Sequence, residues 1–405
     1  MKDPAGWRTG RLGDLVAFKT GKLDSNAAVP NGDYPFFTCS QETLRTNTFS
    51  FDGECVLLAG NNANGIFPLK YFHGKFDAYQ RTYVVRPQNT AVLTTKFLYY
   101  ALRPKLSELR SFSTGAATKF LTLTILNDTQ IPVPPLTEQR RIAGILSAYD
   151  ELIENSQRRI QILETMTRAI YREWFVRFRF PGHEEAPHVA SPIGNTPQGW
   201  EPTAVPQAVL VNPRVTVPCD GDKPFLPMSS LSHDSMLVSD VEYRSGNSGS
   251  KFQNGDTLFA RITPCLENGK TGFVQFLPTA DAVAFGSTEF IVLRSRTLTP
   301  EFVYCLARSE EFRGVAIKSM SGASGRQRVQ EQCFDEFMIA QPPRDLLDRF
   351  SAIVSPRFRL IHALHRQIEN LRRTRDLLLP RLMAGQVSPR VSGSAIRPEA
   401  KGETS

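Results

Sequence analysis

The sequence predicts a mixed α/β (α+β) protein in which two tandem domains of strands and helices are separated by two long helices that form an antiparallel coiled coil. Two observations lead to this prediction. Motifs from the first half of the chain recur in the same order in the second half, which indicates a pseudo-twofold internal repeat. Each copy also ends in a Pro-Pro pair, at 134–135 and 342–343, followed by apolar residues at alternating spacings of three and four.

The repeat is carried by short motifs that keep their order. Gly6-Trp7 recurs as Gly199-Trp200. Three longer pairs are GECVLLA (53–59) with GDTLFAR (255–261), KFLYYALR (96–103) with EFVYCLAR (301–308), and STGAATK (113–119) with MSGASGR (320–326). The first of these pairs aligns Ala59 with Arg261. The copies diverge most before the Pro-Pro pair.

Within each copy, the local patterns predict strands followed by helices. The apolar and β-branched runs CVLLA, TYVVRP, TLFARI and EFIVLR are typical of short strands. The segments TKFLYYALRPKLSELRSF and PEFVYCLARSEEFRGVAI predict helices. Proline disfavours helix in the residue before it, so each Pro-Pro pair marks a boundary. We expect Thr137 to cap a helix over 137–178, and Pro380 to kink the second long helix near its end.

Neither long helix can bury its apolar seam against a small front domain, so we expect each to bury the other. The predicted coiled-coil or subunit-interface residues are Ile142, Ile145, Tyr149, Leu152, Leu163, Ile170, Trp174, Ile361, Leu364, Ile368, Leu371 and Leu378. The predicted organisation is a first domain over 1–135, a central helical spacer over 136–180, a linker over 181–198, a second domain over 199–341, a C-terminal helical spacer over 342–385 and a disordered tail over 386–405.

Composition narrows the class of protein. The formal net charge of +8 permits a polyanionic partner, although a merely basic soluble protein fits it equally well. No run approaches the length of a membrane helix, and MKDPAGWRTG lacks the apolar core of a signal peptide. The six cysteines are scattered and form no CxxC, which favours reduced thiols over disulfides or zinc. We therefore expect a cytoplasmic protein without metal or membrane association.

Two similar heads on a basic chain suit duplex DNA, whose grooves repeat along its axis. Arginine reads guanine edges, and asparagine or glutamine reads adenine. The candidate DNA-binding residues lie in Gly-rich polar segments: Asn61, Asn62, Asn64, Lys70, Gln80, Arg81, Lys119, Arg261, Asn268, Lys270, Ser287, Thr288 and Arg326. An ordinary turn role is the alternative for each. For Arg261, base reading, phosphate contact and a structural role all stay open.

Catalytic motifs are not found in the sequence. NGKT (268–271) resembles the end of a phosphate-binding loop, but Pro264 stands where that loop needs glycine, and TGFVQF after it predicts a strand instead of a helix. His362 and His365 lack the acidic third ligand of a zinc site. No nucleophile–histidine–acid signature is present. The sequence predicts a non-catalytic chain that binds no cofactor of its own.

The tandem arrangement, together with PPLTEQRRIAGILSAYDELIENSQRRI, YREWFVRFRFPGHE, GSTEFIVLR and LLLPRLMAGQV, resembles the specificity subunit of type I restriction–modification enzymes. The resemblance implies two target-recognition domains that each read half of a split double-stranded DNA sequence, with the coiled coil setting their spacing. It also implies two modification subunits that carry S-adenosylmethionine for DNA methylation, and restriction/translocase subunits that use ATP and Mg²⁺ in phage defence. The open alternatives are a coiled-coil protein-interaction adaptor and a nucleotide-binding enzyme.

Overall fold

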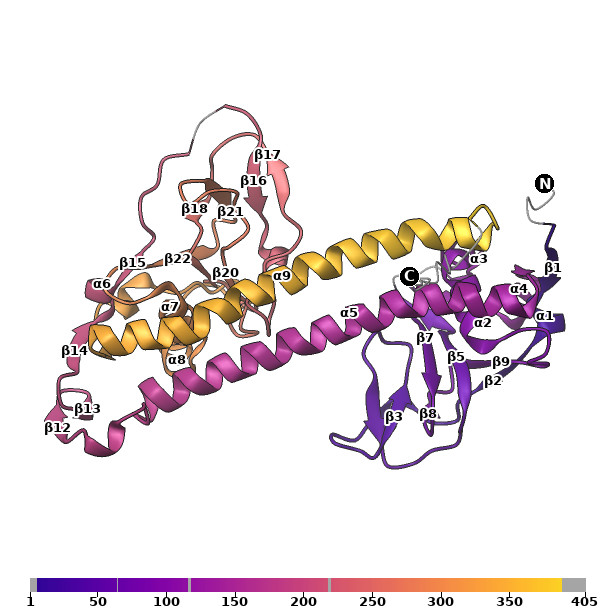
Figure 1. Ribbon diagram of the computed structural model, residues 1–405, viewed down its shortest axis with the longest axis horizontal. Coiled ribbons are helices and arrows are strands. Elements are labelled where there is room, and N and C mark those ends of the chain that lie inside the picture. Colours follow the sequence, from indigo (N-terminus) through magenta and orange to yellow (C-terminus); the bar gives the residue numbers. More distant parts are fainter. Residues whose placement is uncertain (1–5, 64, 116–117, 218–219, 388–405) are drawn as a thin grey trace, which may run out of the picture. The chain divides into compact units, whose positions relative to one another are not determined.

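The computed structural model describes residues 6–63, 65–115, 118–217 and 220–387. It divides into two compact units, Met1–Ile153 with Asn370–Ser405, and Glu154–Glu369. The two long helices, α5 (Leu136–Tyr171) and α9 (Arg344–Met383), each contribute residues to both units. The predicted combination of mixed strand–helix domains with two long helices is confirmed (Figure 1).

The first unit, which we call unit 1, is built on two small sheets. The four-stranded sheet has the order β2-β9-β5-β7, and the three-stranded sheet has the order β4-β3-β8. Its elements before α5 are β1 (Arg8–Arg11), α1 (Leu12–Leu15), β2 (Val16–Thr20), β3 (Tyr34–Phe37), β4 (Leu44–Thr46), β5 (Glu54–Ala59), β6 (Asn61–Asn62), β7 (Leu69–His73), β8 (Asp77–Ala78), β9 (Thr82–Pro87), α2 (Thr95–Leu102), α3 (Leu106–Phe112), β10 (Lys119–Phe120), α4 (Leu123–Asp128) and β11 (Gln130–Val133).

The second unit, unit 2, repeats this plan. Its sheets have the orders β15-β22-β19-β20 and β17-β16-β21-β18. Its elements before α9 are β12 (His188–Ser191), β13 (Gly194–Pro197), β14 (Glu201–Ala204), α6 (Val205–Ala208), β15 (Val209–Val211), β16 (Lys223–Leu226), β17 (Glu242–Arg244), β18 (Ser250–Gln253), β19 (Thr257–Ala260), β20 (Thr271–Phe273), β21 (Val283–Gly286), β22 (Phe290–Ser295), α7 (Pro300–Arg308), α8 (Glu310–Lys318) and β23 (Met338–Gln341).

The strand register corrects one detail of the sequence repeat. In unit 1, β5 pairs antiparallel with β9 so that Ala59 faces Thr82. In unit 2, the equivalent strands β19 and β22 pair Ala260 with Phe290. Ala59 is therefore equivalent to Ala260, and not to Arg261 as the motif alignment indicated. The backbone hydrogen bonds, and not the glycine before each motif, define the true correspondence.

The predicted strands and helices of each copy are confirmed, with each predicted helix divided in two. In unit 1 a 3-10 turn that contains Pro104 separates α2 from α3. In unit 2 an extended Ser309 ends α7, and its hydroxyl accepts from the Phe312 N–H to cap α8. Thr94 and Thr299 cap α2 and α7 in the same way, by accepting from the N–H three residues on.

The junction before α5 depends on one buried glutamine. Helix α5 begins at Leu136, so Thr137 lies inside its first turn, and the expectation that Thr137 caps the helix is wrong. Gln139 is fully buried, donates to the carbonyls of Val92 and Pro134, each at 2.8 Å, and accepts from the Thr94 N–H at 2.9 Å. Its side chain thereby holds the Pro-Pro turn against the residue that caps α2.

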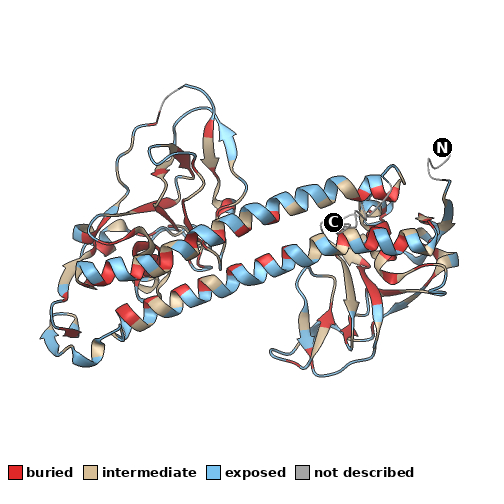
Figure 2. Cartoon of the chain, viewed as in Figure 1, coloured by how far each residue is buried: buried red, intermediate tan, exposed pale blue. Residues whose placement is uncertain are grey.

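Both long helices show the heptad spacing of a coiled coil, and Figure 2 shows buried residues recurring along α9. Of the predicted seam residues, Ile142, Trp174, Ile361, Leu364 and Ile368 are buried, and Ile145, Tyr149, Leu163, Ile170, Leu371 and Leu378 are half-buried. Leu152 is 49% exposed, whereas Ile153 is 6% exposed. The assignment of Leu152 to the seam is corrected to Ile153, which keeps the seven-residue spacing from Leu146 to Ile160.

Inside each unit, the beginning of one long helix packs near the end of the other. In unit 1, Leu379 and Leu382 of α9 belong to the same core cluster as Ile142 and Leu146 of α5. In unit 2, the ring of Phe350 near the start of α9 lies 4.9 Å from the ring of Phe175, which follows α5. This pairing of opposite ends is the antiparallel arrangement that the sequence predicts.

The end of α5 differs from the prediction. Helix α5 ends at Tyr171 and is followed by one π-helical turn, Arg172–Val176. The α-helix is therefore shorter than the expected 137–178. The segment 181–198, expected to be a linker, contains the β12–β13 hairpin. Helix α9 continues through Pro380 to Met383. The predicted disorder of the tail falls mostly on 388–405, outside the described residues. No helix in the described ranges is long and apolar enough to span a bilayer.

Candidate nucleic-acid interface

Three segments of unit 1 meet where the central strand β5 ends. The Gly60 N–H donates to the Arg81 carbonyl at 2.8 Å, and the Leu121 N–H donates to the Gly60 carbonyl at 2.8 Å. Beyond Gly60, β6 pairs with β10, which places Asn61 opposite Phe120 and Asn62 opposite Lys119. The backbone therefore gathers residues from three distant parts of the sequence at one strand end.

Unit 2 repeats this backbone arrangement at the end of β19. The Arg261 N–H donates to the Glu289 carbonyl at 3.0 Å, and the Val329 N–H donates to the Arg261 carbonyl at 2.9 Å. An isolated bridge places Ile262 opposite Arg328. Arg261 therefore occupies the place of Gly60, Glu289 that of Arg81, and Arg328 that of Phe120. We call the two arrangements the strand-end sites.

The strand-end site of unit 1 contains most of the predicted DNA-binding residues of that unit. Arg81 and the ring of Phe120 are exposed, and the Arg81 guanidinium lies 5.9 Å from the ring centroid. Gln80 is exposed beside Arg81, and Asn61, Asn62 and Lys119 lie on the paired strands β6 and β10. Asn64 lies outside the described residues.

Lys70 lies apart from these contacts, on β7. Its ammonium group donates to the Glu42 carbonyl and to the Thr43 hydroxyl, each at 3.0 Å. Burial lowers the pKa of Lys70 below its ordinary value, although the charge of Glu42 opposes this. The side chain is therefore held by its own unit, which favours a structural role over DNA contact.

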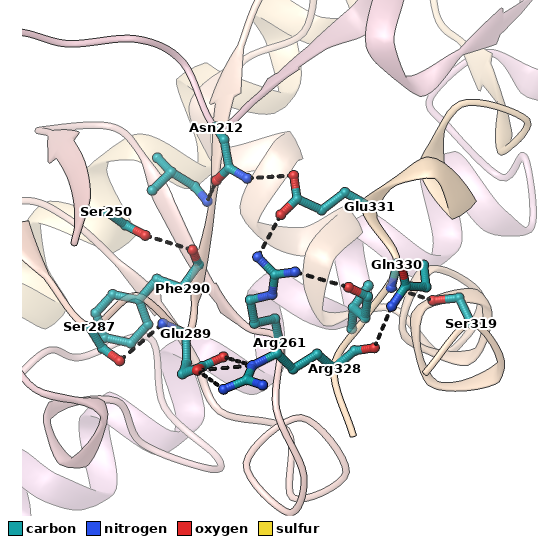
Figure 3. Close-up of polar contacts among 12 residues, drawn as sticks. Asn212, Ser250, Arg261, Ser287, Glu289, Phe290, Ser319, Arg328, Gln330 and Glu331 are labelled. Atoms are coloured by element: carbon teal, nitrogen blue, oxygen red, sulfur yellow. Dashed lines mark hydrogen bonds and ion pairs between the residues drawn. The ribbon is translucent and has the colours of Figure 1, made fainter. Parts of the chain in front are cut away.

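Arg261 is the predicted residue with the most contacts in unit 2. Its guanidinium donates to Glu331 at 2.8 Å and to the Val329 carbonyl at 3.3 Å. Asn212 donates to the other oxygen of Glu331, so the carboxylate joins two segments of the unit (Figure 3). Only 26% of the Arg261 side chain is exposed. These contacts favour the structural role among the three that the sequence left open.

The other predicted residues of unit 2 divide into two groups. Thr288 is exposed and Ser287 is half-buried, both beside Glu289 at the strand-end site. Arg326 is exposed two residues before Arg328. Lys270 donates to the Met228 carbonyl at 3.1 Å, so it supports a turn. Asn268 is exposed in the same turn as Lys270.

That turn does not have the form of a phosphate-binding loop. The N–H groups of Asn268, Gly269 and Lys270 donate to the carbonyls of Pro264, Leu266 and Cys265. The residues after it form β20, as the sequence predicts. Because these N–H groups already have partners inside the turn, they offer no cradle to a phosphate. In the described part of the chain, no group of three or more His, Cys, Asp or Glu side chains is placed to hold a metal ion.

The structure adds site residues that the sequence did not suggest. A hollow of about 330 Å³ lies beside the unit 2 site and is lined by three basic residues, Arg214, Lys251 and Arg261, with no acidic residue in its lining. Arg328 donates to both carboxylate oxygens of Glu289, with distances between 2.6 and 3.0 Å. These hydrogen bonds hold the pKa of Glu289 below its ordinary value, against a smaller effect of burial. Arg214, Lys251 and Arg328 lie far apart in the sequence and belong to no recognisable motif, so only the fold shows that they are near one another.

The fold and the strand-end sites define a protein with two equivalent mixed strand–helix units and two long helices, in which each unit has basic side chains at its strand-end site. Comparison with known proteins agrees with this class. The family model described as "Type I restriction modification DNA specificity domain" matches residues 4–165. This part of the chain therefore resembles that domain, and the chain is similar to the specificity subunits of type I restriction enzymes.

Individual relatives support this placement. The chain is 38% identical over 173 residues to the type I restriction enzyme EcoDI specificity subunit of Escherichia coli, across 42% of this chain and 38% of that protein. It is 26% identical over 312 residues to the MjaIX specificity subunit of Methanocaldococcus jannaschii, across 73% of this chain and 69% of that one. The crystal structure of a type I restriction–modification system S subunit from M. genitalium has the same fold, with a TM-score of 0.62 at 16% identity, over 94% of this chain and 97% of that chain.

Proposed function

We propose that the chain is the DNA sequence-recognition subunit of a type I restriction–modification complex. Units 1 and 2 each read one half of a split duplex target, and the subunit directs partner methyltransferase and restriction subunits to it. One observation carries the proposal: an equivalent four-stranded sheet and the same strand-end backbone hydrogen bonds occur in both units, with different side chains on them. Two equivalent frameworks with different surfaces suit two different half-sites.

The charges at the strand-end sites support a nucleic-acid partner. Arg81 and Lys119 lie at the site of unit 1, and Arg214, Lys251 and Arg328 lie at or beside the site of unit 2. Basic side chains contact phosphates, and those that reach the grooves read bases. In this proposal the chain performs no chemistry and works in the cytoplasm. Two modification subunits supply S-adenosylmethionine and methyl transfer, and restriction subunits supply ATP- and Mg²⁺-dependent translocation.

The protein-interaction adaptor is the alternative that the long helices suggest. The modification subunits of the proposed complex would also contact the helices, so helix binding alone does not separate the two ideas. DNA specificity separates the two ideas. If the chain is an adaptor, exchanging residues of units 1 and 2 leaves the DNA preference of the complex unchanged.

An exchange of recognition domains tests the proposal. Residues 199–341 are replaced by the equivalent segment of a relative with a different target, and the subunit is produced with its modification partners. We expect methylome sequencing to show a target changed in one half and kept in the other. A parallel exchange of the unit 1 front domain, residues 1–135, should change the other half. Complexes that methylate the same sequence after both exchanges would contradict the proposal.

A further inference from the structure

In each strand-end site, the side chains at two equivalent positions contact each other, but the residue types at these positions differ between the units. In unit 1, the guanidinium of Arg81, directly before β9, lies 5.9 Å from the centroid of the Phe120 ring, within cation–π range. In unit 2, Glu289 directly before β22 forms a bidentate ion pair with Arg328. The backbone hydrogen bonds described above make these pairs equivalent residue by residue. One position thus carries Arg or Glu, and its partner carries Phe or Arg.

We propose that these two pairs are equivalent base-reading positions, and that each determines the identity of a base pair in its own half-site. This inference rests on the proposed DNA-recognition function and goes beyond it, because it assigns named side chains to the reading step. The Arg328 pair reads guanine through hydrogen bonds. The Arg81–Phe120 pair reads guanine with the arginine and a neighbouring thymine methyl with the ring.

The contacts of Arg328 leave a suitable edge for guanine. Glu289 accepts from the Nε and Nη2 atoms of Arg328, which fixes the plane of the guanidinium. The edge between Nη1 and Nη2 is a different edge, and a guanidinium edge can bond O6 and N7 of guanine together. The Arg328 side chain is 50% exposed, whereas that of Glu289 is 20% exposed. Glu289 is therefore a positioning residue, and Arg328 is the residue that reaches outward.

The unit 1 pair places a guanidinium beside an aromatic ring, with the arginine at the position that Glu289 occupies in unit 2. A guanidinium that stacks on an aromatic face keeps its N–H edges free for a ligand. Phe120 is 38% exposed, so its ring is open to an apolar partner as well as to Arg81. Apolar contact with the thymine methyl is an established way for phenylalanine to read DNA. In the described part of unit 1, no ion pair joins Arg81 to a carboxylate, so its reading is expected to be less strict than that of Arg328.

The backbone hydrogen bonds of the strand-end sites, which we call the frame, explain how the side chains can differ while the backbone arrangement stays the same. The hydrogen bonds of the frame join backbone atoms only, so they do not depend on which side chains occupy positions 81, 120, 289 and 328. A third equivalent position, Gly60 in unit 1 and Arg261 in unit 2, has a side chain only where the neighbouring groups leave space for one. A Cβ atom at Gly60 would lie 2.6 Å from the Arg81 carbonyl oxygen and 2.9 Å from the ring of Tyr83, so these two groups leave no space for a side chain. In unit 2 the residue equivalent to Tyr83 is Ile291, and Arg261 occupies the third position.

The test uses the complete complex with its modification partners and duplexes in which each base pair of the target is changed singly. Arg328→Lys keeps the positive charge and removes the bidentate edge. We expect it to lower discrimination at one position of the second half-site by roughly 5- to 150-fold, and to leave the first half-site unchanged. Arg81→Lys and Phe120→Leu should each relax the first half-site only. Methylation rates and competition binding at two salt concentrations measure the effect.

Two matched controls lie elsewhere on the same units. Lys75, whose ammonium lies 4.7 Å from the centroid of the exposed Phe49 ring, forms another cation–aromatic pair in unit 1. Arg244, with a side chain 50% exposed, forms an ion pair with Glu242 in unit 2. Lys75→Ala and Arg244→Ala should keep wild-type discrimination at every position. Melting curves of all variants identify any that lose their fold, and the conservative Lys and Leu replacements are chosen to avoid that loss.

The outcomes separate this inference from the proposed function. A wild-type complex that shows no preference among the duplexes would overturn both. A selective wild-type complex whose Arg328→Lys, Arg81→Lys and Phe120→Leu variants keep full discrimination would overturn the inference alone. Equal weakening on all duplexes with a flatter salt dependence would make these residues phosphate contacts, and would also overturn it.

Discussion

Glu164 of helix α5 accepts a hydrogen bond from the Ser235 hydroxyl at 2.7 Å, and the same oxygen accepts from the Met236 N–H at 2.8 Å. The glutamate is 5% exposed, and the loop that it holds lies between β16 and β17 of unit 2. Arg168, one turn further along α5, lies 3.7 Å from its other oxygen. A single carboxylate thus holds a loop of unit 2 against the long helix.

Removal of this carboxylate should destabilise unit 2. Glu164→Ala leaves the buried Met236 N–H without its acceptor, and an unpaired buried donor costs about 1–3 kcal/mol of unfolding free energy. Glu154→Ala is the matched control, because Glu154 is exposed on α5 and forms its ion pair with Arg158 one turn away. It should change stability by less than about 0.5 kcal/mol. Equal melting temperatures for the two variants would show that the Glu164 contacts contribute nothing measurable.

The stability should also depend on pH in a direction set by Glu164. Burial raises the pKa of its carboxyl above the ordinary 4.5, although the bonds from Ser235 and Met236 oppose this. The folded protein then binds this proton more tightly than the unfolded chain does. The contribution of Glu164 to the unfolding free energy is therefore present below pH 4.5 and is lost as the pH rises through the raised pKa. The unfolding free energy of the wild type relative to Glu164→Gln should therefore fall across that window.

Glu289 serves as a control, because its effect on the pH dependence of stability should be opposite to that of Glu164. Its hydrogen bonds with Arg328 hold its pKa below 4.5, so its contribution is present above that pH and is lost as the pH falls through the lowered pKa. The unfolding free energy of the wild type relative to Glu289→Gln should fall on acidification. Denaturant titrations of the three proteins at a series of pH values measure both trends, and trends of the same sign would contradict the assignment.

The heptad register of α5 can be tested with two isoleucines two residues apart. Ile160 is 5% exposed and Ile162 is 52% exposed. Ile160→Ala should lower the unfolding free energy by about 2–5 kcal/mol, because it removes buried methyl groups and leaves a cavity. Ile162→Ala should change it by less than about 0.5 kcal/mol. Chemical denaturation compares the two, and a larger loss for Ile162→Ala would place the seam on the other face of the helix.

The Pro-Pro junctions of the two copies should respond differently to leucine. Gln139 in the first junction is equivalent to Leu347 in the second, counted from each Pro-Pro pair, and Leu347 is 1% exposed. Gln139→Leu should nevertheless destabilise unit 1 by about 1–3 kcal/mol, because the Thr94 N–H loses its buried acceptor. Arg140→Leu, at an exposed position of the same turn, is the control for adding an apolar side chain. A neutral Gln139→Leu would show that water can replace the glutamine.

The sequence by itself determined the repeat, the strands and helices within each copy, and the two long helices. Their signals are local, since apolar periodicity and proline act within a few residues. It also placed Arg81 and Arg261 among the candidates, because each lies in a polar segment suited to a groove loop.

Only the tertiary structure decided which of those candidates meet and what each contacts. The one-residue shift that makes Ala260 the counterpart of Ala59 arises from strand pairing, which sequence similarity does not reveal. Phe120 and Arg328 reach the strand-end sites through backbone hydrogen bonds to residues far away in the chain. Leu152 and Ile153 are equally apolar, and packing alone selects which one is buried. Such choices depend on contacts between distant segments, and a single sequence records no distances between them.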